Sequence, residues 1–558
     1  MTMLHTQREL EELLEYDFAT AVAALDYWVS DEPDRLAIHN GENDERLTYA
    51  EFGRLTDFIA GNLTARGLRV GDAVSVLSTQ PLVATLAMYG IWKAGGLYAP
   101  VNFQYTGELL AYQLNDTQPV LLIVDDALLE TVAAVEPQLH QLPEQIVVGS
   151  NGGGAFEELL QPSGRPAFRP TSHDAANIIY TSGTTGPSKG VIQSHRWVNG
   201  YTWAGRRALT RDDVVYNDLP MYHVGGAHFN VTRALWSGAA VSLWARFSPT
   251  EFWNRIRAGN CTTAVLLDVM TPWLLNAEPR DDDRLNPLNK VHMQPLPVDH
   301  HEFAVRFGID FVTSGFGQSE TGASLMLLID ELSDGQGTPS ELYRGLPRAG
   351  VRASFSDNGL AVRRGDSALP KGIMGHPAPF MEVAVLDELD HEVAPGEIGQ
   401  LAMRPKLPSL IFTEYLAKPE ATVDAWRNLW FHTGDAALRE ADGTFCYVDR
   451  LGDRIRVRGE NISSFHVEEL VARHSTVQLA AVIAVPSDEG DEDDVVAFIE
   501  LAVGATFDTT VLRQHCAETM PKYMRPKVFV QVDEIPRTPT NKIEKYKLRR
   551  QWMDGVNR

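Results

Sequence analysis

Short apolar runs alternate with helical stretches through the first several hundred residues. Ala73–Leu77 and Val120–Val124 are rich in β-branched residues, and Val83–Lys93 between them has the spacing of a helix. The same alternation returns at Val241–Trp244 and Thr263–Leu267. A βαβα pattern of this kind predicts parallel sheets covered by helices on both faces.

A second pattern occupies the segment from Val383 to Val448. Shorter alternating strands are separated there by Gly and Asp, and Asp442-Gly443 between two alternating runs predicts a hairpin turn. The chain shows no repeat of solenoid period. The sequence therefore predicts a mixed α/β protein with one β-rich part.

Length and composition favour a globular protein of several domains. At roughly 100–200 residues per domain, 558 residues predict three or four folding units. Hydrophobic residues make up 44% and charged residues 22%, which excludes wholesale disorder and fibrous structure. The N-terminus has no apolar signal region, and the apolar stretch Pro81–Trp92 is shorter than the roughly 20 residues of a membrane span. Cys261, Cys446 and Cys516 are odd in number and widely spaced, so we expect neither disulfides nor a metal cluster, and a cytoplasmic protein without an integral membrane segment.

The charge balance narrows the choice of partners. Lys and Arg number 49 against 74 Asp and Glu, a net charge of −25. Nucleic acids and anionic membranes are held by clustered basic residues, so we expect no nucleic acid as a partner. Residues 453–558 are nearly balanced, with 15 basic and 17 acidic residues. Two explanations for the higher share of basic residues in this segment stay open. It is either a solvated basic C-terminus or a small domain whose positive face meets anionic ligands.

The stretch from Asn177 to Val191 carries the strongest chemical signal. An apolar strand runs into a loop dense in Gly, Ser and Thr with a single lysine, Lys189, and a second short strand follows. Such a loop presents backbone N–H groups and hydroxyls to phosphate oxygens. A Walker A loop is excluded because Lys189 follows Ser188 and precedes Gly190. Ser194 then predicts the N-cap of a helix that begins at His195.

Further motifs follow this loop in a fixed order. They are Gly315-Phe-Gly-Gln-Ser-Glu-Thr321, Trp430-Phe-His-Thr-Gly-Asp435, Val448–Ile455 with Gly459–Asn461, and Pro536–Ile543 with Lys542. Together with Tyr180–Val191, they resemble the motifs of the adenylate-forming superfamily of acyl-CoA synthetases, peptide adenylation domains and luciferases. The resemblance extends from about Leu47 to Leu548, and Arg458–Phe465 resembles the crotonobetaine/carnitine-CoA ligase-like branch.

The resemblance implies a particular organisation. A large N-terminal portion, residues 1–450, would contain two αβ-layered subdomains and a β-rich subdomain. A hinge at residues 449–453 would lead to a small, mobile α+β domain, residues 453–558, that carries Lys542. The hinge position is Gly452, a residue suited to a large backbone rotation.

The resemblance also implies a reaction. A carboxylate attacks the α-phosphate of Mg-ATP to give an acyl-adenylate and pyrophosphate, and a thiol, commonly that of coenzyme A, then displaces AMP. Two anions meet in the first step, so positive charge and positioning are needed at the α-phosphate. Lys542 would supply that charge, Ser319 would bind the α-phosphate, and Glu320 would bind Mg²⁺.

Other residues would hold the nucleotide and the thiol. The phosphate-binding residues would be Thr181, Ser182, Gly183, Thr184, Thr185, Gly186 and Lys189. Phe316 and Gly317 would bind on the adenine side, and Asp435 and Arg450 would bind the ribose hydroxyls. Arg458 stands where the family has glycine, next to Gly459: it would either bind phosphates of coenzyme A or narrow the pantetheine tunnel.

The acyl pocket is implied by Leu219–Gly226, which resembles the segment that closes over the carboxylate in acyl- and aryl-CoA ligases, with His223 as its catalytic residue. The expected pocket residues are His223, Val224, Gly225, Asp268, Met270, Ser314 and Gly315. No Asp is present for an α-ammonium group, so we expect a plain carboxylic acid. His292–Pro297 replaces the usual Gly-Gly-Ala-Pro-type segment on the adenine side.

Two rival functions belong to different classes. An adenylation-only enzyme would hand its acyl-AMP to a carrier-protein thiol or to a partner acyltransferase. A catalytically inactive nucleotide-binding regulator is disfavoured because Lys542, Glu320 and Asp435 are all retained. The sequence leaves the identity of the acid open, and a monomer and a homodimer are equally compatible with it.

Overall fold

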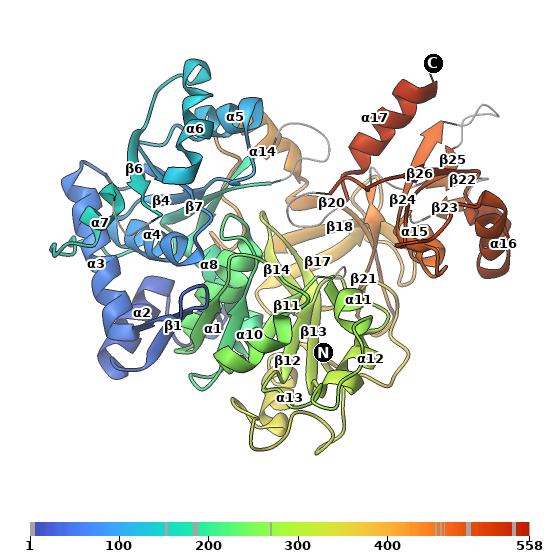
Figure 1. Cartoon of the computed structure of the whole chain (residues 1–558), viewed down its shortest axis with the longest axis horizontal. Helices are drawn as coiled ribbons and strands as arrows, with labels where there is room; N and C mark the ends of the chain where they lie inside the picture. Colours follow the sequence, from blue (N-terminus) through green and yellow to red (C-terminus); the bar gives the residue numbers. More distant parts are fainter. Residues whose placement is uncertain are drawn as a thin grey trace. The chain divides into compact units, whose positions relative to one another are not determined.

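The computed structural model describes residues 6–150, 154–181, 188–267, 270–451, 455–457, 460–462, 464–486, 493–537 and 543–556 (Figure 1). Two compact units divide the chain. Unit 1 comprises Met1–Thr181, Pro187–Glu382 and Met403–Arg427, and unit 2 comprises Ser182–Gly186, Val383–Ala402 and Asn428–Arg558. The expected domain boundary, with its hinge at residues 449–453, stays a prediction, because Gly452 and Asp453 lie outside the described residues.

The first sheet of unit 1 contains the strand before the glycine-rich loop and the strand after it. Its order is β6 (Glu144–Val148), β5 (Leu121–Asp125), β3 (Ala73–Leu77), β4 (Leu97–Pro100), β7 (Ala175–Tyr180) and β8 (Gly190–Ser194). All neighbours are parallel except β7 and β8, which form an antiparallel pair. The predicted alternation of buried strands and helices is confirmed, with strand ends shifted by one residue at β5.

A second set of strands in unit 1 supports the Gly315–Thr321 motif. In order, it contains β16 (Ile373–Pro377), β14 (Gly322–Asp330), β13 (Phe311–Gln318), β12 (Lys290–Met293), β11 (Thr263–Leu266), β9 (Val214–Asn217), β10 (Ala240–Leu243), β1 (Leu36–Asn40) and β2 (Glu45–Thr48), with β15 (Ala361–Arg364) beside β14. Within this set, neighbouring strands are parallel from β1 through β10, β9, β11 and β12 to β13. Strand β14 turns back antiparallel to β13. The motif therefore lies where a parallel sheet ends and a hairpin begins.

Helices cover these sheets. The longer ones in unit 1 are α1 (Gln7–Leu14), α2 (Ala21–Asp31), α3 (Tyr49–Ala65), α4 (Pro81–Ala94), α5 (Gly107–Thr117), α8 (His195–Arg206), α10 (Phe252–Gly259), α12 (His300–Phe307) and α13 (Arg348–Ser356). Short ones are α6 (Leu129–Ala133), α7 (Ala155–Leu159), the π-helix η3 (Gly225–Thr232), α9 (Arg233–Trp236), α11 (Met270–Leu275) and α14 (Pro419–Ala425). No helix among the described residues is both long and apolar enough to cross a membrane.

Helix α8 is buried along its whole length and is central to unit 1. The Ser194 hydroxyl accepts a hydrogen bond from the Trp197 N–H at 3.0 Å, which confirms the predicted N-cap. The N-terminal segment packs against α8 and neutralises its arginines. Arg206 Nη1 lies 2.6 Å from Asp17 Oδ2, and Arg196 Nη2 lies 3.0 Å from Glu15 Oε1.

Unit 2 begins with strands in the order β17 (Met381–Leu386), β18 (Ile398–Pro405), β20 (Trp430–Arg439) and β21 (Phe445–Arg450). The predicted hairpin is confirmed: β20 and β21 are antiparallel and are joined through Gly443, whose φ of 88° favours glycine. The C-terminal part contains β22 (Ile455–Val457), β23 (Glu460–Ile462), β24 (Val477–Pro486), β25 (Asp493–Leu501), β26 (Val528–Val532), α15 (Ser464–Ala472), α16 (Thr509–Thr519) and α17 (Lys545–Val556).

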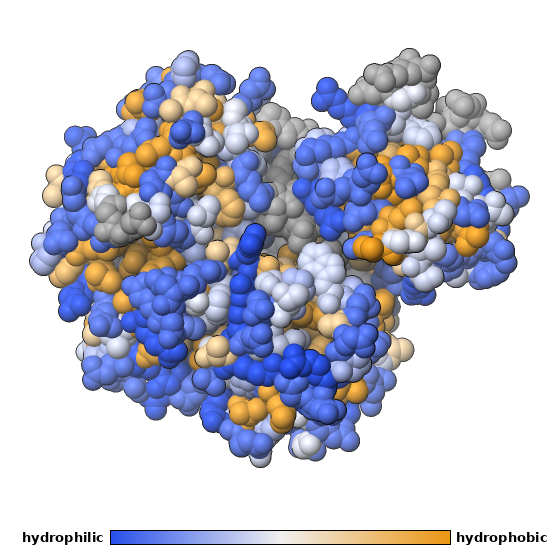
Figure 2. All heavy atoms as spheres, in the orientation of Figure 1, coloured by the Kyte–Doolittle hydropathy of each residue, from blue (hydrophilic) through white to orange (hydrophobic). Residues whose placement is uncertain are grey.

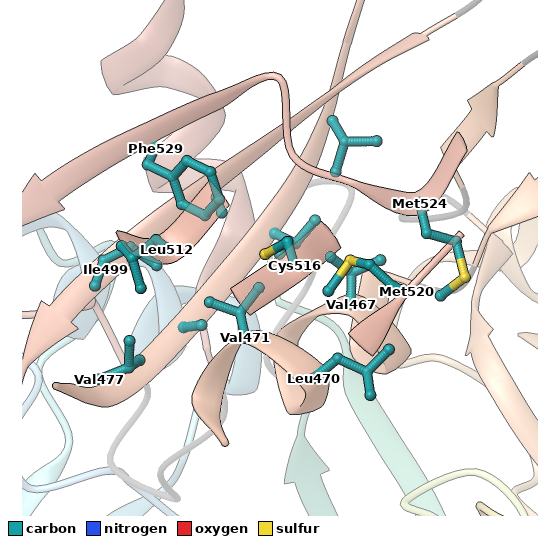
Figure 3. Close-up of a cluster of buried hydrophobic side chains, with 14 of the residues drawn as sticks. Val467, Leu470, Val471, Val477, Ile499, Leu512, Cys516, Met520, Met524 and Phe529 are labelled. Carbon is teal, nitrogen blue, oxygen red and sulfur yellow. The ribbon is translucent and has the colours of Figure 1, made fainter. Parts of the chain in front are cut away.

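The C-terminal part of unit 2 has a hydrophobic core of its own. Val467, Leu470 and Val471 from α15 face Cys516 from α16 and Phe529 from β26 (Figure 3). A hydrophobic core of its own is a property of a separate domain. The face of the protein drawn in Figure 2 is mostly hydrophilic, with hydrophobic residues in smaller patches.

Candidate active site

The two ends of the glycine-rich loop are held together at the base. The Thr181 N–H donates to the Lys189 carbonyl at 3.1 Å, and the Tyr112 hydroxyl donates to the Ser188 carbonyl at 2.7 Å. Lys189 Nζ lies 4.7 Å from the ring centroid of Tyr415, within the range of a cation–π contact. The expected phosphate-binding residues between the two ends, Ser182, Gly183, Thr184, Thr185 and Gly186, lie outside the described residues.

The Ser319-Glu320 turn follows β13 and is fixed by three hydrogen bonds to its carbonyl groups. Gln193 Nε2 donates to the Ser319 carbonyl at 2.8 Å. The Trp197 indole N–H (3.2 Å) and the Phe412 N–H (2.7 Å) both donate to the Glu320 carbonyl. Because these donors come from β8, from α8 and from the segment after β18, the turn has a single position set by three elements.

The Glu320 carboxylate is oriented by a tyrosine. The Tyr415 hydroxyl donates to Glu320 Oε1 at 2.9 Å, and burial together with this carboxylate raises the pKa of Tyr415. The sequence analysis missed Tyr415, and no local signal marks it, because it lies 95 residues from its partner.

A divalent cation fits this carboxylate when other ligands share it. The described residues contain no group of three or more His, Cys, Asp or Glu side chains that could hold a metal by themselves. Mg²⁺ is commonly bound by one or two carboxylates together with phosphate oxygens and water. Glu320 is half-buried, and its chemistry suits a metal held jointly with a nucleotide.

Phe316 and Gly317 precede this turn on β13. The Phe316 side chain is buried, with 8% of its surface exposed. At Gly317 an added Cβ would lie 2.8 Å from the Gly322 carbonyl oxygen, so the hairpin of β13 and β14 requires glycine there. The adenine-side role expected for Phe316 and Gly317 stays a prediction.

His223 lies in the turn before η3 with a defined tautomer. The Gly225 N–H donates to His223 Nδ1 at 3.1 Å, so the proton of the neutral ring is on Nε2. A side chain at position 225 would begin 3.2 Å from this nitrogen, which explains the glycine. Val224 is buried beside it. The arrangement makes His223 Nε2 a hydrogen-bond donor.

The structure describes three of the four remaining residues that were expected in the acyl pocket. Met270 and Ser314 are buried, and the Ser314 hydroxyl has no hydrogen-bond partner among the described residues. An added Cβ at Gly315 would lie 2.3 Å from the Leu325 carbonyl oxygen, so only glycine fits. Asp268 lies outside the described residues.

Unit 2 contributes a preformed charge pair. Asp435 on β20 and Arg450 on β21 are register partners, and Arg450 Nε lies 2.9 Å from Asp435 Oδ1. Asp435 is buried, whereas the Arg450 side chain is 37% exposed. A buried carboxylate beside an accessible guanidinium offers an acceptor and a donor to a diol. Arg458, Gly459 and Lys542 lie outside the described residues.

A separate network in unit 2 links β21 to the C-terminal helices. Asp449 Oδ2 accepts hydrogen bonds from the Ser464 N–H and hydroxyl, both at 2.6 Å. Lys545 Nζ donates to the Ser464 hydroxyl at 2.5 Å and lies 2.8 Å from Glu468 Oε1. The network joins Asp449, the first residue of the expected hinge, to the N-terminus of α15 and to α17.

Comparisons with known proteins agree with this geometry. The model of the AMP-binding enzyme family matches residues 25–416, and that of the AMP-binding enzyme C-terminal domain matches residues 466–542. The crotonobetaine/carnitine–CoA ligase of Salmonella arizonae is 27% identical over 526 residues, which cover 90% of this chain and 93% of the relative. The medium/long-chain-fatty-acid–CoA ligase FadD6 of Mycobacterium tuberculosis is 27% identical over 529 residues, 93% of this chain and 83% of the relative.

Solved structures extend the likeness to the fold. ATP-bound MatB from Rhodopseudomonas palustris superposes with a TM-score of 0.80 at 25% identity, covering 96% of this chain and 99% of that one. The o-succinylbenzoate CoA synthetase MenE from Bacillus subtilis, in complex with OSB-AMP, gives a TM-score of 0.74 at 21% identity, covering 94% and 97%, and supports the fold alone.

Fold, site and relatives together define an AMP-forming ligase of the acyl-CoA synthetase branch of adenylate-forming enzymes. The chain belongs to the AMP-binding enzyme family, with its N-terminal and C-terminal domains in the expected order. The resemblance inferred from the ordered motifs is thereby confirmed.

Proposed function

We propose that this protein joins a carboxylic acid to coenzyme A in two steps. The acid first attacks the α-phosphate of ATP, forming an acyl-adenylate and releasing pyrophosphate; the thiol of coenzyme A then attacks the acyl carbon and displaces AMP. The observation that carries the proposal is the convergence of two motifs on Tyr415. Its hydroxyl binds Glu320 and its ring lies beneath Lys189, so the phosphate-loop lysine and the metal-binding carboxylate meet at one side chain.

The first step must overcome repulsion between two anions. Lys189 would bind the outer phosphates, and Lys542 would bridge the acid carboxylate and the α-phosphate, where charge develops in the transition state. Glu320 would hold Mg²⁺, which when bound neutralises phosphate charge. The Ser319 hydroxyl would donate to an α-phosphate oxygen, and Asp435 with Arg450 would fix the ribose.

His223 positions the acid. Since Nδ1 accepts from the Gly225 N–H, Nε2 carries the proton and can donate to a carboxylate oxygen of the substrate. A neutral donor orients the nucleophile without neutralising it, so the attacking oxygen keeps its charge. Val224, Gly225, Gly315 and Asp268 would form walls of the acyl pocket.

In the second step the C-terminal domain would rotate, so that a different face of this domain is turned toward the acyl-adenylate. Rotation at Gly452 would withdraw Lys542 and bring the Arg458-Gly459 loop toward the thiol. The relatives named as CoA ligases support coenzyme A as the acceptor. Because ATP and coenzyme A are the substrates and all three cysteines are free thiols, we place the reaction in the cytoplasm.

A second candidate is adenylation without coenzyme A. Arg458, in place of glycine, favours it, because a long cation narrows a tunnel that pantetheine must enter. The acyl-adenylate would then pass to a carrier-protein thiol or a partner acyltransferase.

The test is pyrophosphate release from Mg-ATP over a panel of carboxylic acids, with and without coenzyme A, with acyl-AMP and acyl-CoA measured by mass. We expect acyl-CoA from a preferred acid. Lys542→Ala should lower acyl-AMP formation by about 10²–10³-fold, the scale of one lost electrostatic group in a transition state, with unchanged folding. Acyl-AMP that accumulates untouched by coenzyme A would instead establish the second candidate, and no adenylation of any acid would refute both.

A further inference from the structure

Arg233 is a buried cation that forms no direct ion pair with a carboxylate among the described residues. It begins α9 directly after the π-helix η3, and 3% of its surface is exposed. Its Nε and Nη2 atoms have no hydrogen-bond partner among the described residues. Asp213 is a charged group that acts on it, but Asp213 is already bound by Lys290 Nζ at 2.8 Å and by the Thr262 hydroxyl at 2.7 Å.

Other buried arginines of unit 1 are paired. Arg206 on α8 lies against Asp17, and Arg196 against Glu15, although both are as buried as Arg233. Arg196 and Arg206, which are as buried as Arg233, thus each have a carboxylate partner. The contrast indicates that the partner of Arg233 is a group that the protein's own described side chains do not supply.

Two aromatic rings surround the guanidinium. Its carbon lies 4.3 Å from the ring centroid of Phe229 on η3, and Tyr201 on α8 acts on it electrostatically. Helix α8 makes room for it at Gly205, where an added Cβ would lie 2.7 Å from Arg233 Cδ. Burial lowers the pKa of Arg233 to about 10, which leaves it charged at neutral pH. Neither ring can accept a hydrogen bond from Nε and Nη2 together, so this edge of the guanidinium stays unpaired among the described residues.

One of these rings connects Arg233 to the expected acyl pocket. The Phe229 ring lies 4.4 Å from that of His292 on β12, and His292 pairs with Thr313 on β13. Side chains two residues apart on a strand share a face, so Gly315 lies on the same face as Thr313. Gly315 is one of the pocket walls expected from the sequence.

The other ring connects Arg233 to the catalytic turn. Tyr201 stacks on Trp197 with ring centroids 4.8 Å apart, and the Trp197 indole donates to the Glu320 carbonyl. The cation therefore lies behind the aromatic residues that adjoin both the pocket wall and the metal-binding turn, all within unit 1.

We propose that Arg233 determines substrate specificity by binding a second anionic group at the far end of the acid, so that the preferred substrates are dicarboxylates and not simple monoacids. A buried charge is stable only when it is paired, and a bidentate carboxylate matches the guanidinium edge. The inference rests on the proposed function, because it concerns the acid that is activated. It adds the chemical class of that acid.

The first experiment compares matched pairs of acids with the unaltered protein. Each α,ω-dicarboxylate, from four to ten carbons, is paired with the monoacid in which a methyl group replaces the distal carboxylate, and aromatic diacids are paired with toluic acids. We expect at least one diacid to exceed its partner in kcat/KM by about 10²–10⁴-fold, the range for a site with a buried polar group left unpaired. A preference for monoacids at every length would overturn the inference and leave the proposed function standing, whereas no activation of any acid would count against the function itself.

The second experiment uses three variants. Arg233→Met should lower kcat/KM for the preferred diacid by about 10²–10³-fold and change that of the matched monoacid little, and Arg233→Lys should retain part of the preference. Arg207→Met is the matched control, since Arg207 also stacks on rings, those of Tyr16 and Trp203, but outside the pocket; it should keep the wild-type preference.

If Arg233→Met lowers kcat/KM equally for the diacid and the monoacid, while thermal unfolding and ATP binding are unchanged, the proposal is wrong and Arg233 does not bind a distal carboxylate. If Arg233→Met does not fold, Arg233→Lys decides. The measured quantity is then kcat/KM for the diacid divided by kcat/KM for the matched monoacid. A ratio equal to that of the wild type contradicts the proposal, and a lower ratio supports it.

Discussion

Tyr415 shows how one side chain can set the geometry of two charges. Its hydroxyl fixes one oxygen of Glu320, and its ring accepts the Lys189 ammonium. Neither contact neutralises its charged partner, since a phenol donates to a carboxylate and a ring face attracts a cation. Glu320 and Lys189 thus keep their charges for the metal and phosphate roles proposed for them, while Tyr415 orients both side chains.

Tyr415→Phe should weaken the binding of Mg²⁺. The ring beneath Lys189 is kept and only the bond to Glu320 is lost, so the half-saturating Mg²⁺ concentration should rise about 10–100-fold, as for other residues that orient a metal ligand. The measurement is pyrophosphate release against Mg²⁺ at saturating ATP. Tyr343→Phe, which removes a hydroxyl bonded to the Leu346 carbonyl, is the control and should leave this concentration unchanged. An unaltered Mg²⁺ dependence in Tyr415→Phe would remove Glu320 from metal binding.

For single residues, the sequence predicted the candidates that lie within local motifs and missed those that matter only through contacts with distant parts of the chain. Glu320, Lys189 and His223 stand in recognisable local patterns. Tyr415 and Arg233 do not, because their meaning arises from partners on other elements. One signal was present for Arg233: a single cation within Ala-His-Phe-Asn-Val-Thr-Arg-Ala-Leu-Trp, an otherwise uncharged run. The acid could not be predicted because the shape of an acyl pocket depends on side chains from several distant segments of the chain.

Among the elements, strands and helices with strong periodicity were predicted closely. Ala73–Leu77 is β3 without change, and the helix from His195 is α8. The π-helix η3 was not foreseen, since its five-residue hydrogen-bond spacing has no hydrophobic signature of its own. Strand β21 ends at Arg450, within the expected hinge at residues 449–453, and Asp449 on it is bonded to Ser464. The bond joins the strand before Gly452 to the start of the helix α15 after it.

Gly452→Pro should separate the two half-reactions. Proline fixes φ near −65°, so the chain there could no longer rotate, while acyl-AMP formation needs only one of the two domain positions. We expect acyl-AMP formation to stay near wild type and thioester formation to fall about tenfold or more, since each 1.4 kcal/mol added to a barrier costs that factor. Gly452→Ala, which keeps φ adjustable, is the control. Equal loss of both half-reactions in the proline variant would place the hinge elsewhere.

For the whole molecule, buried imidazoles couple stability to pH. Burial lowers the pKa of His195 and His292 to about 4 and that of His228 to about 3, all in unit 1. In the unfolded chain these groups take up protons near pH 6.5. The unfolded state therefore binds more protons than the folded state between pH 6.5 and 4, and the free energy of unfolding falls as the pH falls through that window.

The three imidazoles should contribute about 4 kcal/mol per pH unit to this slope near pH 5, and Asp218, whose pKa burial raises to about 7, should offset part of it. Urea unfolding followed by tryptophan fluorescence at pH 7, 6 and 5 measures it, because Trp92 and Trp197 adjoin these rings. His228→Gln should reduce the contribution of the imidazoles by about a third, one of three titrating groups. Stability that stays constant from pH 7 to 5 would contradict the prediction.

The π-helix η3 also bears on how such an enzyme changes its substrate over evolutionary time. A π-turn holds one residue more than an α-turn, and losing that residue would restore ordinary helical winding. Everything downstream would then rotate by roughly 100° about the helix axis, which would carry Arg233 off Phe229 in a single step. A one-codon deletion could thus abolish a charge preference that would otherwise require replacing the arginine itself, and a one-codon insertion could create it from a neutral ancestor that already held an arginine nearby.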